Sequence, residues 1–136
     1  MNVATLAAAL IASWEGCRLT AYQDSGGVWT IGFGHTAGVK EGDTCTPAQA
    51  AQWLASDAAP LLALVFDEPL VSAAAHVSFG YNLGRGALEL VLAGKATLGH
   101  FVHDRHGNVL DGLVRRRAAE QALIDSFMPD STTVGP

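Results

Sequence analysis

Three residues near the start of the chain, Glu15, Asp24 and Thr30, have types that could act together on one substrate. Two carboxyl groups on either side of a cleft are what most glycoside hydrolases use. One must be protonated, so that it can give its proton to the leaving oxygen, and the other must be ionised. Glu15, next to Trp14 on an apolar helix face, suits the acid, and Asp24, in a solvated Ser-Gly turn, suits the base. Thr30 would then hold the attacking water.

The same residues also have ordinary structural explanations. A glutamate at a helix end is usually solvated, and an aspartate before Ser-Gly-Gly usually forms a turn. Residue types and spacing alone therefore leave a structural role open beside the catalytic one.

A helix and a β-hairpin are predicted to position these residues. VATLAAALIASW, residues 3–14, places its larger apolar side chains on one helical face, with Asn2 suited to cap the start and Gly16 the end. Residues 19–22 and 28–33 have the composition of two strands around a Gly-rich turn, and a third short strand is expected near Val39. The helix end and the hairpin would bring the three candidate residues around one space.

The rest of the chain has helical periodicity. Thr46 begins a capping box with Pro at the next position, which predicts a helix to about Ala58, where Pro60 interrupts the pattern. LVSAAAHVSFGYNL is apolar nearly all round and predicts a central buried helix that Gly84 and Gly86 end. The remaining expected elements are an apolar turn at 61–66, short helices at 88–92 and 97–102, a loop at 103–112 and a final helix at 112–127.

We therefore expect an α+β, mainly α, fold in a single domain of residues 1–136. A β-rich lobe would span about 17–45, and a helical lobe would combine residues 1–16 and 46–128, followed by a frayed tail at 129–136. A substrate would lie in the cleft between two such lobes.

Composition limits the function classes. Hydrophobic residues make up 49% of the 136-residue chain and charged residues 15%, which indicates a folded domain. The balance of 8 basic and 13 acidic residues gives a net charge of −5, which argues against nucleic-acid binding. No run reaches the roughly 20 apolar residues that a membrane-spanning helix needs. The first apolar stretch has no preceding Lys or Arg, so a helix of the fold is favoured over the alternative, an uncleaved export signal.

Cysteine and histidine spacing gives no strong metal-site pattern. Cys17 and Cys45 lack metal-ligand spacing, and we expect two small buried thiols in a reducing compartment, with a disulfide as the alternative. Three histidines recur at every third residue in HFVHDRH, a spacing at which imidazoles can share a helical face and bind a metal. Gly107 and Asn108 break a helix there, so a solvated loop is the favoured interpretation. These histidines are His100, His103 and His106.

A long motif carries a resemblance to a known family. EGCRLTAYQDSGGVWTIGFGHTAGVKEGDT, residues 15–44, closely resembles the signature of the phage lysozymes, the endolysin muramidases of glycoside hydrolase family 24. That signature reads E-G-x-x-L-x-A-Y-x-D-x-x-G-x-x-T-I-G-Y/F-G-H-T and then G-V-x-x-G-D-T, and every fixed position is present. VSFGYNLGRGAL and GLVRRRAAEQAL resemble later segments of the family, so the resemblance covers nearly the whole chain and implies a lysozyme-like fold.

The resemblance implies a muramidase that lyses bacterial cells by cutting the β-1,4 bond between N-acetylmuramic acid and N-acetylglucosamine in peptidoglycan. Glu15 would be the general acid, and Asp24 and Thr30 would position water on the opposite face of the sugar, which is an inverting scheme. Neither a metal nor an organic cofactor is implied. We expect a monomer without stable membrane insertion, held in the host cytoplasm until a pore protein releases it to the cell wall.

Four further residues have expected roles, which follow from the resemblance except at His35, where the acid and base roles are already filled. Arg116 is the best match to the family's buried arginine, whose ion pair would orient Glu15. His35 is expected to be structural and to pair with an acid of the helical lobe. Thr36 and Tyr81 fall where relatives line the sugar groove.

Two alternative functions stay open. A lytic transglycosylase cuts the same bond by internal attack and needs only the acid. A non-catalytic peptidoglycan-binding domain usually lacks the acid or the base. The presence of Asp24 and Thr30 together with Glu15 favours the hydrolase.

Overall fold

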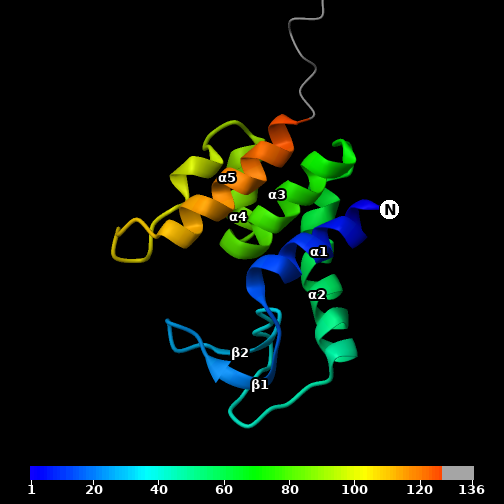
Figure 1. The fold of residues 1–136 in the computed structure, drawn as a ribbon, viewed down its shortest axis with the longest axis vertical. Coiled ribbons are helices and arrows are strands. Elements are labelled where there is room, and N and C mark those ends of the chain that lie inside the picture. The colour runs from blue at the N-terminus through cyan, green and yellow to red at the C-terminus, as the bar shows by residue number, and fades with distance from the viewer. Residues whose placement is uncertain (127–136) are drawn as a thin grey trace, which may run out of the picture.

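The computed structural model describes residues 1–126, in which helices form one lobe and a small two-stranded sheet forms the other (Figure 1). This confirms the predicted α+β, mainly α, fold class. Residues 127–136, which include the end of the last predicted helix and the predicted tail at 129–136, lie outside the described residues. The elements in chain order are α1 (Val3–Glu15), β1 (Arg18–Gln23), β2 (Trp29–Gly32), α2 (Pro47–Leu62), η1 (Ala63–Val65), α3 (Leu70–Leu83), α4 (Arg85–Leu92), η2 (Leu98–His100) and α5 (Asp111–Asp125).

Helix α1 has the predicted caps. The Asn2 side chain accepts a hydrogen bond from the Thr5 backbone N–H at 2.8 Å, and Gly16 ends the helix with a φ of +68°. The left-handed φ is accessible to glycine without steric cost, so the chain can turn sharply there into β1. Ala7 and Ile11 are fully buried, which anchors the helix in the core and fixes where its last residue points.

Strands β1 and β2 form the predicted hairpin, with Tyr22 opposite Thr30. The expected third strand near Val39 is wrong. Gly38 and Gly42 have positive φ there, and the Val39 N–H bonds back to Thr36 O in a turn. The chain rejoins the hairpin only further along, through an isolated bridge between Thr20 and Thr44.

Helix α2 continues through Pro60 instead of ending near Ala58. Proline lacks an N–H and so removes one helical hydrogen bond. That loss falls in the last turn of the helix, and the next residue, Leu61, is only 4% exposed. Burial of a leucine is worth about 1.5–3 kcal/mol, enough to offset much of the cost of the proline.

Helix α3 is the centre of the helical lobe and packs against α1, α2, α4 and α5. Phe79 is fully buried on it. A Cβ at Gly80 would lie 2.9 Å from Leu88 Cδ2 and 3.1 Å from Leu61 Cδ2, so glycine is needed for α4 and the end of α2 to close on α3. Gly84 ends α3 as predicted, but Gly86 lies inside α4, which begins at Arg85 and not at residue 88.

Several smaller expectations also needed correction. The helix expected at 97–102 is one 3-10 turn, and α5 begins at Asp111, one residue early. Both cysteines are free thiols, but Cys17 is exposed and Cys45 only half-buried, because Cys17 follows the point where the chain leaves α1. Within residues 1–126 no helix is both long enough and apolar enough to span a bilayer.

Candidate active site

A pocket of about 240 Å³ lies between the end of α1, the hairpin and α3. The three candidate catalytic residues meet there, and so do the two candidate groove residues, Thr36 and Tyr81. The complete lining is Glu15, Tyr22, Asp24, Thr30, Gly34, Thr36, Tyr81 and Asn82. A neighbouring pocket of about 350 Å³ shares Gly34, Thr36 and Tyr81, so the cleft continues toward α2 and α4.

Glu15 presents one carboxylate oxygen to the protein and the other to the pocket. Its Oε1 accepts a hydrogen bond from Arg116 Nη1 at 2.7 Å, and its side chain is 23% exposed. Its Oε2 faces the Gly34 backbone, where a Cβ would lie 3.6 Å from it. That distance is an ordinary van der Waals contact, so glycine is needed at position 34 for its backbone conformation, a φ of +93°, and not for space.

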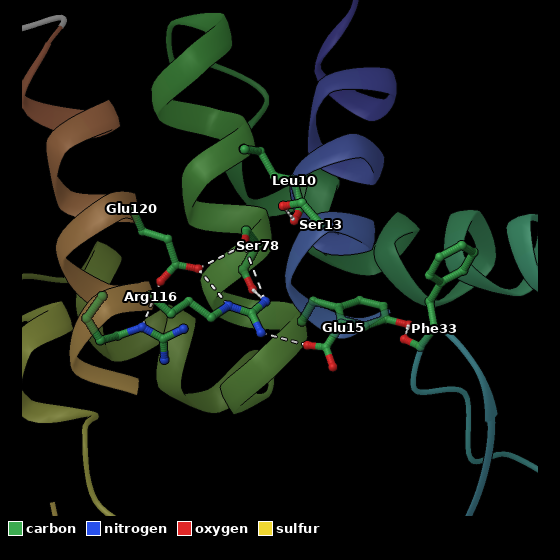
Figure 2. A network of polar contacts seen from close by, with 9 residues as sticks. Leu10, Ser13, Glu15, Phe33, Ser78, Arg116 and Glu120 are labelled. Atoms are coloured by element: carbon green, nitrogen blue, oxygen red, sulfur yellow. Dashed lines mark hydrogen bonds and ion pairs between the residues drawn. The ribbon is translucent and has the colours of Figure 1, made fainter. Parts of the chain in front are cut away.

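Arg116 is held from two helices (Figure 2). Its Nη2 donates to Ser78 O at 3.0 Å, and its Nε donates to Glu120 Oε2 at 3.3 Å. The Ser78 hydroxyl donates to the same Glu120 oxygen at 2.8 Å. Arg116 is 5% exposed and Glu120 is 1% exposed, so this network fixes the guanidinium that contacts Glu15.

Arg117 completes the buried charges. Its Nε donates to Glu120 Oε1 at 2.7 Å, and its guanidinium lies 4.9 Å from the centre of the Phe79 ring. Burial lowers the pKa of Arg117, and the Glu120 carboxylate partly offsets this effect. Glu120 therefore pairs with two arginines at once, and its removal would leave the buried Arg117 without a charged partner.

Asp24 is held by its own turn. Its Oδ1 accepts backbone hydrogen bonds from Gly26 at 2.8 Å and Val28 at 2.9 Å. Its Oδ2 has no hydrogen-bond partner within residues 1–126. One oxygen thus shapes the turn, and the other is left for water or substrate in the pocket.

Thr30 faces Tyr22 across the hairpin and is 4% exposed. Its hydroxyl donates to Val28 O at 2.9 Å, so its proton is not available to donate to a ligand in the pocket. The lone pairs that remain can only accept, and a water in the pocket could therefore donate to Thr30 and to Asp24. A water that donates both of its protons presents its own lone pair in a fixed direction.

Tyr81 ties the helical lobe to the hairpin exit. Its hydroxyl donates to Phe33 O at 2.7 Å, and burial raises the pKa of Tyr81. The hydroxyl therefore keeps its proton at neutral pH and fixes the backbone next to Gly34.

His35 is close to the cleft but does not line the candidate catalytic pocket. Its Nδ1 lies 2.7 Å from Asp57 Oδ2, and its ring stacks on Trp53 with centroids 4.6 Å apart. Asp57 belongs to α2, so His35 pairs with an acid of the helical lobe as expected. Sequence reasoning could not name Asp57, because the two residues are 22 positions apart in different elements.

Sequence reasoning also missed Glu120 and Ser78. A signal for Glu120 was present, since it lies four residues after Arg116 in GLVRRRAAEQAL, where side chains share a helical face. Nothing in the sequence indicated the Ser78 hydroxyl bond.

The three-histidine spacing does not form a metal site in the part of the chain that is described. Residues 1–126 contain no group of three or more His, Cys, Asp or Glu that could hold a metal ion. His100 instead accepts from the Thr97 backbone N–H, and the His106 backbone donates to Asp104. The loop interpretation therefore describes this segment better.

The chain belongs to the phage lysozyme family, whose model matches residues 12–120. Its relatives include the endolysin of Acyrthosiphon pisum secondary endosymbiont phage 1, which is 34% identical over 93% of this chain and 99% of that protein. The endolysin of Bacillus phage PZA is also 34% identical, over 99% of this chain, but this chain covers only 59% of its length.

Solved structures agree with this assignment. The muramidase domain of SpmX from Asticaccaulis excentricus matches with a TM-score of 0.72 and 32% identity, over 90% of this chain and 95% of that one. The active form of P1 phage endolysin Lyz matches with a TM-score of 0.78 and 25% identity, over 93% and 86% of the two chains. The predicted lysozyme-like fold is confirmed, and the chain is a glycosidase-type hydrolase.

Proposed function

We propose that this protein is an endolysin muramidase that hydrolyses the β-1,4 bond between N-acetylmuramic acid and N-acetylglucosamine in bacterial peptidoglycan. The observation that carries the proposal is the single pocket lined by Glu15, Asp24 and Thr30. The names of relatives, endolysins and a muramidase domain, support the same substrate. The protein would reach the host cell wall after release from the cytoplasm through a pore protein.

Glu15 is proposed as the general acid. Arg116 holds Oε1, so the carboxyl cannot rotate freely, and Oε2 is the oxygen left to carry the proton. In the Michaelis complex this proton would pass to the leaving glycosidic oxygen as the C1–O bond breaks. A fixed acid avoids the entropic cost of orienting a free side chain at that moment.

Asp24 and Thr30 are proposed to position the attacking water. Asp24 Oδ2 would accept one proton of the water as the general base, while Thr30 Oγ1 accepts a hydrogen bond from the other. The water oxygen would then attack C1 from the face opposite Glu15 and invert its configuration. This assignment of the acid, base and water-positioning roles needs no metal or organic cofactor.

The nature of the new sugar ends tests this proposal. Purified peptidoglycan would be digested with the protein and the fragments analysed by mass spectrometry. Free reducing muramic acid ends are expected, because water is the nucleophile. Anhydro-muramic ends would indicate a transglycosylase and remove the roles given to Asp24 and Thr30. A folded protein that releases no fragments would instead be a binding domain.

A further inference from the structure

A separate pocket of about 460 Å³ adjoins the candidate active site at the tip of the hairpin. Ser25 and Gly26 form one wall, and they directly follow Asp24 in the turn. Residues 104–106 and Leu110 form the other wall. In Figure 1 the segment between η2 and α5 projects on the same side of the molecule as the tip of the β1–β2 hairpin. The pocket therefore begins at the residue that follows Asp24, on the tip of the hairpin.

The wall opposite the hairpin is a small, well-formed turn. His103 and Val109 form an antiparallel bridge that closes it. Asp104 organises its interior, because Oδ1 accepts from the backbone N–H groups of His106 and Asn108, and Oδ2 accepts from the Asn108 side chain. Both oxygens of the Asp104 carboxylate therefore accept hydrogen bonds from its own turn. These hydrogen bonds lower the pKa of Asp104.

Arg105 is the cation of this pocket. Its Nε donates to His106 Nε2 at 3.3 Å, and its two terminal nitrogens have no hydrogen-bond or ion-pair partner within residues 1–126. The side chain is exposed. Two other arginines near the cleft have carboxylate partners, since Arg116 pairs with Glu15 and Arg85 pairs with Glu89. Arg18 has no ion-pair partner within residues 1–126, but its guanidinium lies over the Tyr22 ring.

We propose that Arg105 binds a carboxylate of the short peptides that muramic acid carries in peptidoglycan. This inference rests on the proposed function of the active site. N-acetylated sugars are uncharged, so a cation at the edge of the cleft has nothing to pair with on the glycan backbone. The stem peptides have free carboxylates, and a guanidinium with two unused nitrogens can bind a carboxylate through two parallel hydrogen bonds.

The protein's overall charge makes such a contact useful. At −5 the chain repels an anionic polymer, so long-range steering does not favour binding. A local cation in the pocket that Ser25 and Gly26 line would counter that repulsion close to the hairpin turn. It would also favour strands that bear peptides over bare or neutral glycan.

The test compares two forms of one substrate. Soluble peptidoglycan strands would be used as prepared and after conversion of their carboxylates to amides with carbodiimide and ammonium. Arg105→Ala is expected to raise KM on the charged strands about two- to fivefold, the usual range for an exposed ion pair, with kcat unchanged. On the amidated strands it should behave like the unaltered protein. Lys95→Ala is the control, because it removes the same charge from an exposed site outside all four described pockets. It should leave KM unchanged on both the charged and the amidated strands.

Contrary results would separate the two proposals. The role of Arg105 would be overturned if Arg105→Ala and the unaltered protein had equal KM values on charged strands. It would also be overturned if the variant raised KM equally on charged and amidated strands. Neither result would affect the proposed muramidase function. An effect that persists on strands stripped of peptide by an amidase, after the lactyl carboxylate that the amidase frees has been converted to an amide, would overturn the stem-peptide assignment. An unaltered protein that cleaves neither substrate would overturn the proposed function, and this inference with it.

Discussion

The two carboxyl groups of the cleft are positioned by opposite means. Glu15 is fixed by Arg116, a residue 101 positions away that is itself held by Glu120 and Ser78 in the buried interior. Asp24 is fixed by two backbone N–H groups within four residues of itself, at the surface. The acid therefore depends on the assembly of the helical lobe, whereas the base depends on one short turn.

This difference has a consequence for mutations. Changes to the fully buried residues that hold Arg116 should affect folding and activity together, because buried charges lose their partners. Changes at the hairpin turn should affect activity with little effect on stability, since an exposed turn contributes little to the free energy of unfolding. Four substitutions would test this difference between the two carboxyl groups.

The largest effect is expected for Glu15→Gln. The amide cannot donate the proton that the leaving oxygen needs, so kcat on peptidoglycan should fall by about 10²–10⁴-fold. The thermal unfolding midpoint should stay close to that of the unaltered protein, because an amide oxygen can still accept from Arg116. Near-normal turnover in a folded Glu15→Gln protein would remove Glu15 from its role.

Glu120→Ala should reduce stability most. It leaves Arg117 buried without a counter-charge and removes one of the two carboxylates that pair with Arg116, at a cost of about 3–5 kcal/mol in the free energy of unfolding. Urea unfolding would measure this value. Glu89→Ala, which breaks the exposed pair with Arg85, is the matched control and should cost at most about 1 kcal/mol. Similar costs for the two variants would show that the buried network does not stabilise the lobe.

Asp24→Asn should separate chemistry from structure. The side-chain oxygen of asparagine can still accept from Gly26 and Val28, so the stability change should stay below about 1 kcal/mol. The general base is lost, and kcat should fall by at least about 10²-fold. Circular dichroism melting and fragment release would be measured on the same sample. A large loss of stability would contradict the view that Asp24 acts only locally.

Tyr81→Phe should have the smallest effect. It removes the hydrogen bond to Phe33 O, which is worth about 0.5–1.5 kcal/mol of stability. Because the folded state raises the pKa of Tyr81, the folded protein keeps the phenol proton above the pH at which the unfolded chain loses it. That contribution to stability is complete below about pH 10 and declines as pH rises above it. The stability difference between the two proteins should therefore shrink above about pH 10, and a constant difference would contradict the assignment.

Local sequence signals predicted much of this fold, because the interactions that form it are local. Asn2 and Gly16 cap α1 as expected, and the apolar run at 70–83 is the buried central helix. The passage of α2 through Pro60 depends on Leu61 reaching the core, which no local pattern records. The missing strand near Val39 has the same kind of cause, since the glycines around it adopt turns that only the completed hairpin defines.

The candidate site divides in the same way. The sequence motif predicted that Glu15, Asp24 and Thr30 would lie together, and all three line one pocket. Their catalytic roles stay predictions, as does the division of the whole chain into a single domain. The partners Asp57, Ser78 and Glu120 come from distant elements, and their roles follow from packing that the sequence does not display.

The configuration of the newly formed sugar end would show whether Glu15 and Asp24 act from opposite faces of the sugar. Proton NMR would follow the first minutes of digestion of soluble peptidoglycan strands, before the anomers equilibrate. Attack by a water held on Asp24 and Thr30, opposite Glu15, predicts that the α anomer of the muramic acid end appears first. Initial release of the β anomer would mean that configuration is retained, and it would contradict the division of labour between the two carboxyl groups.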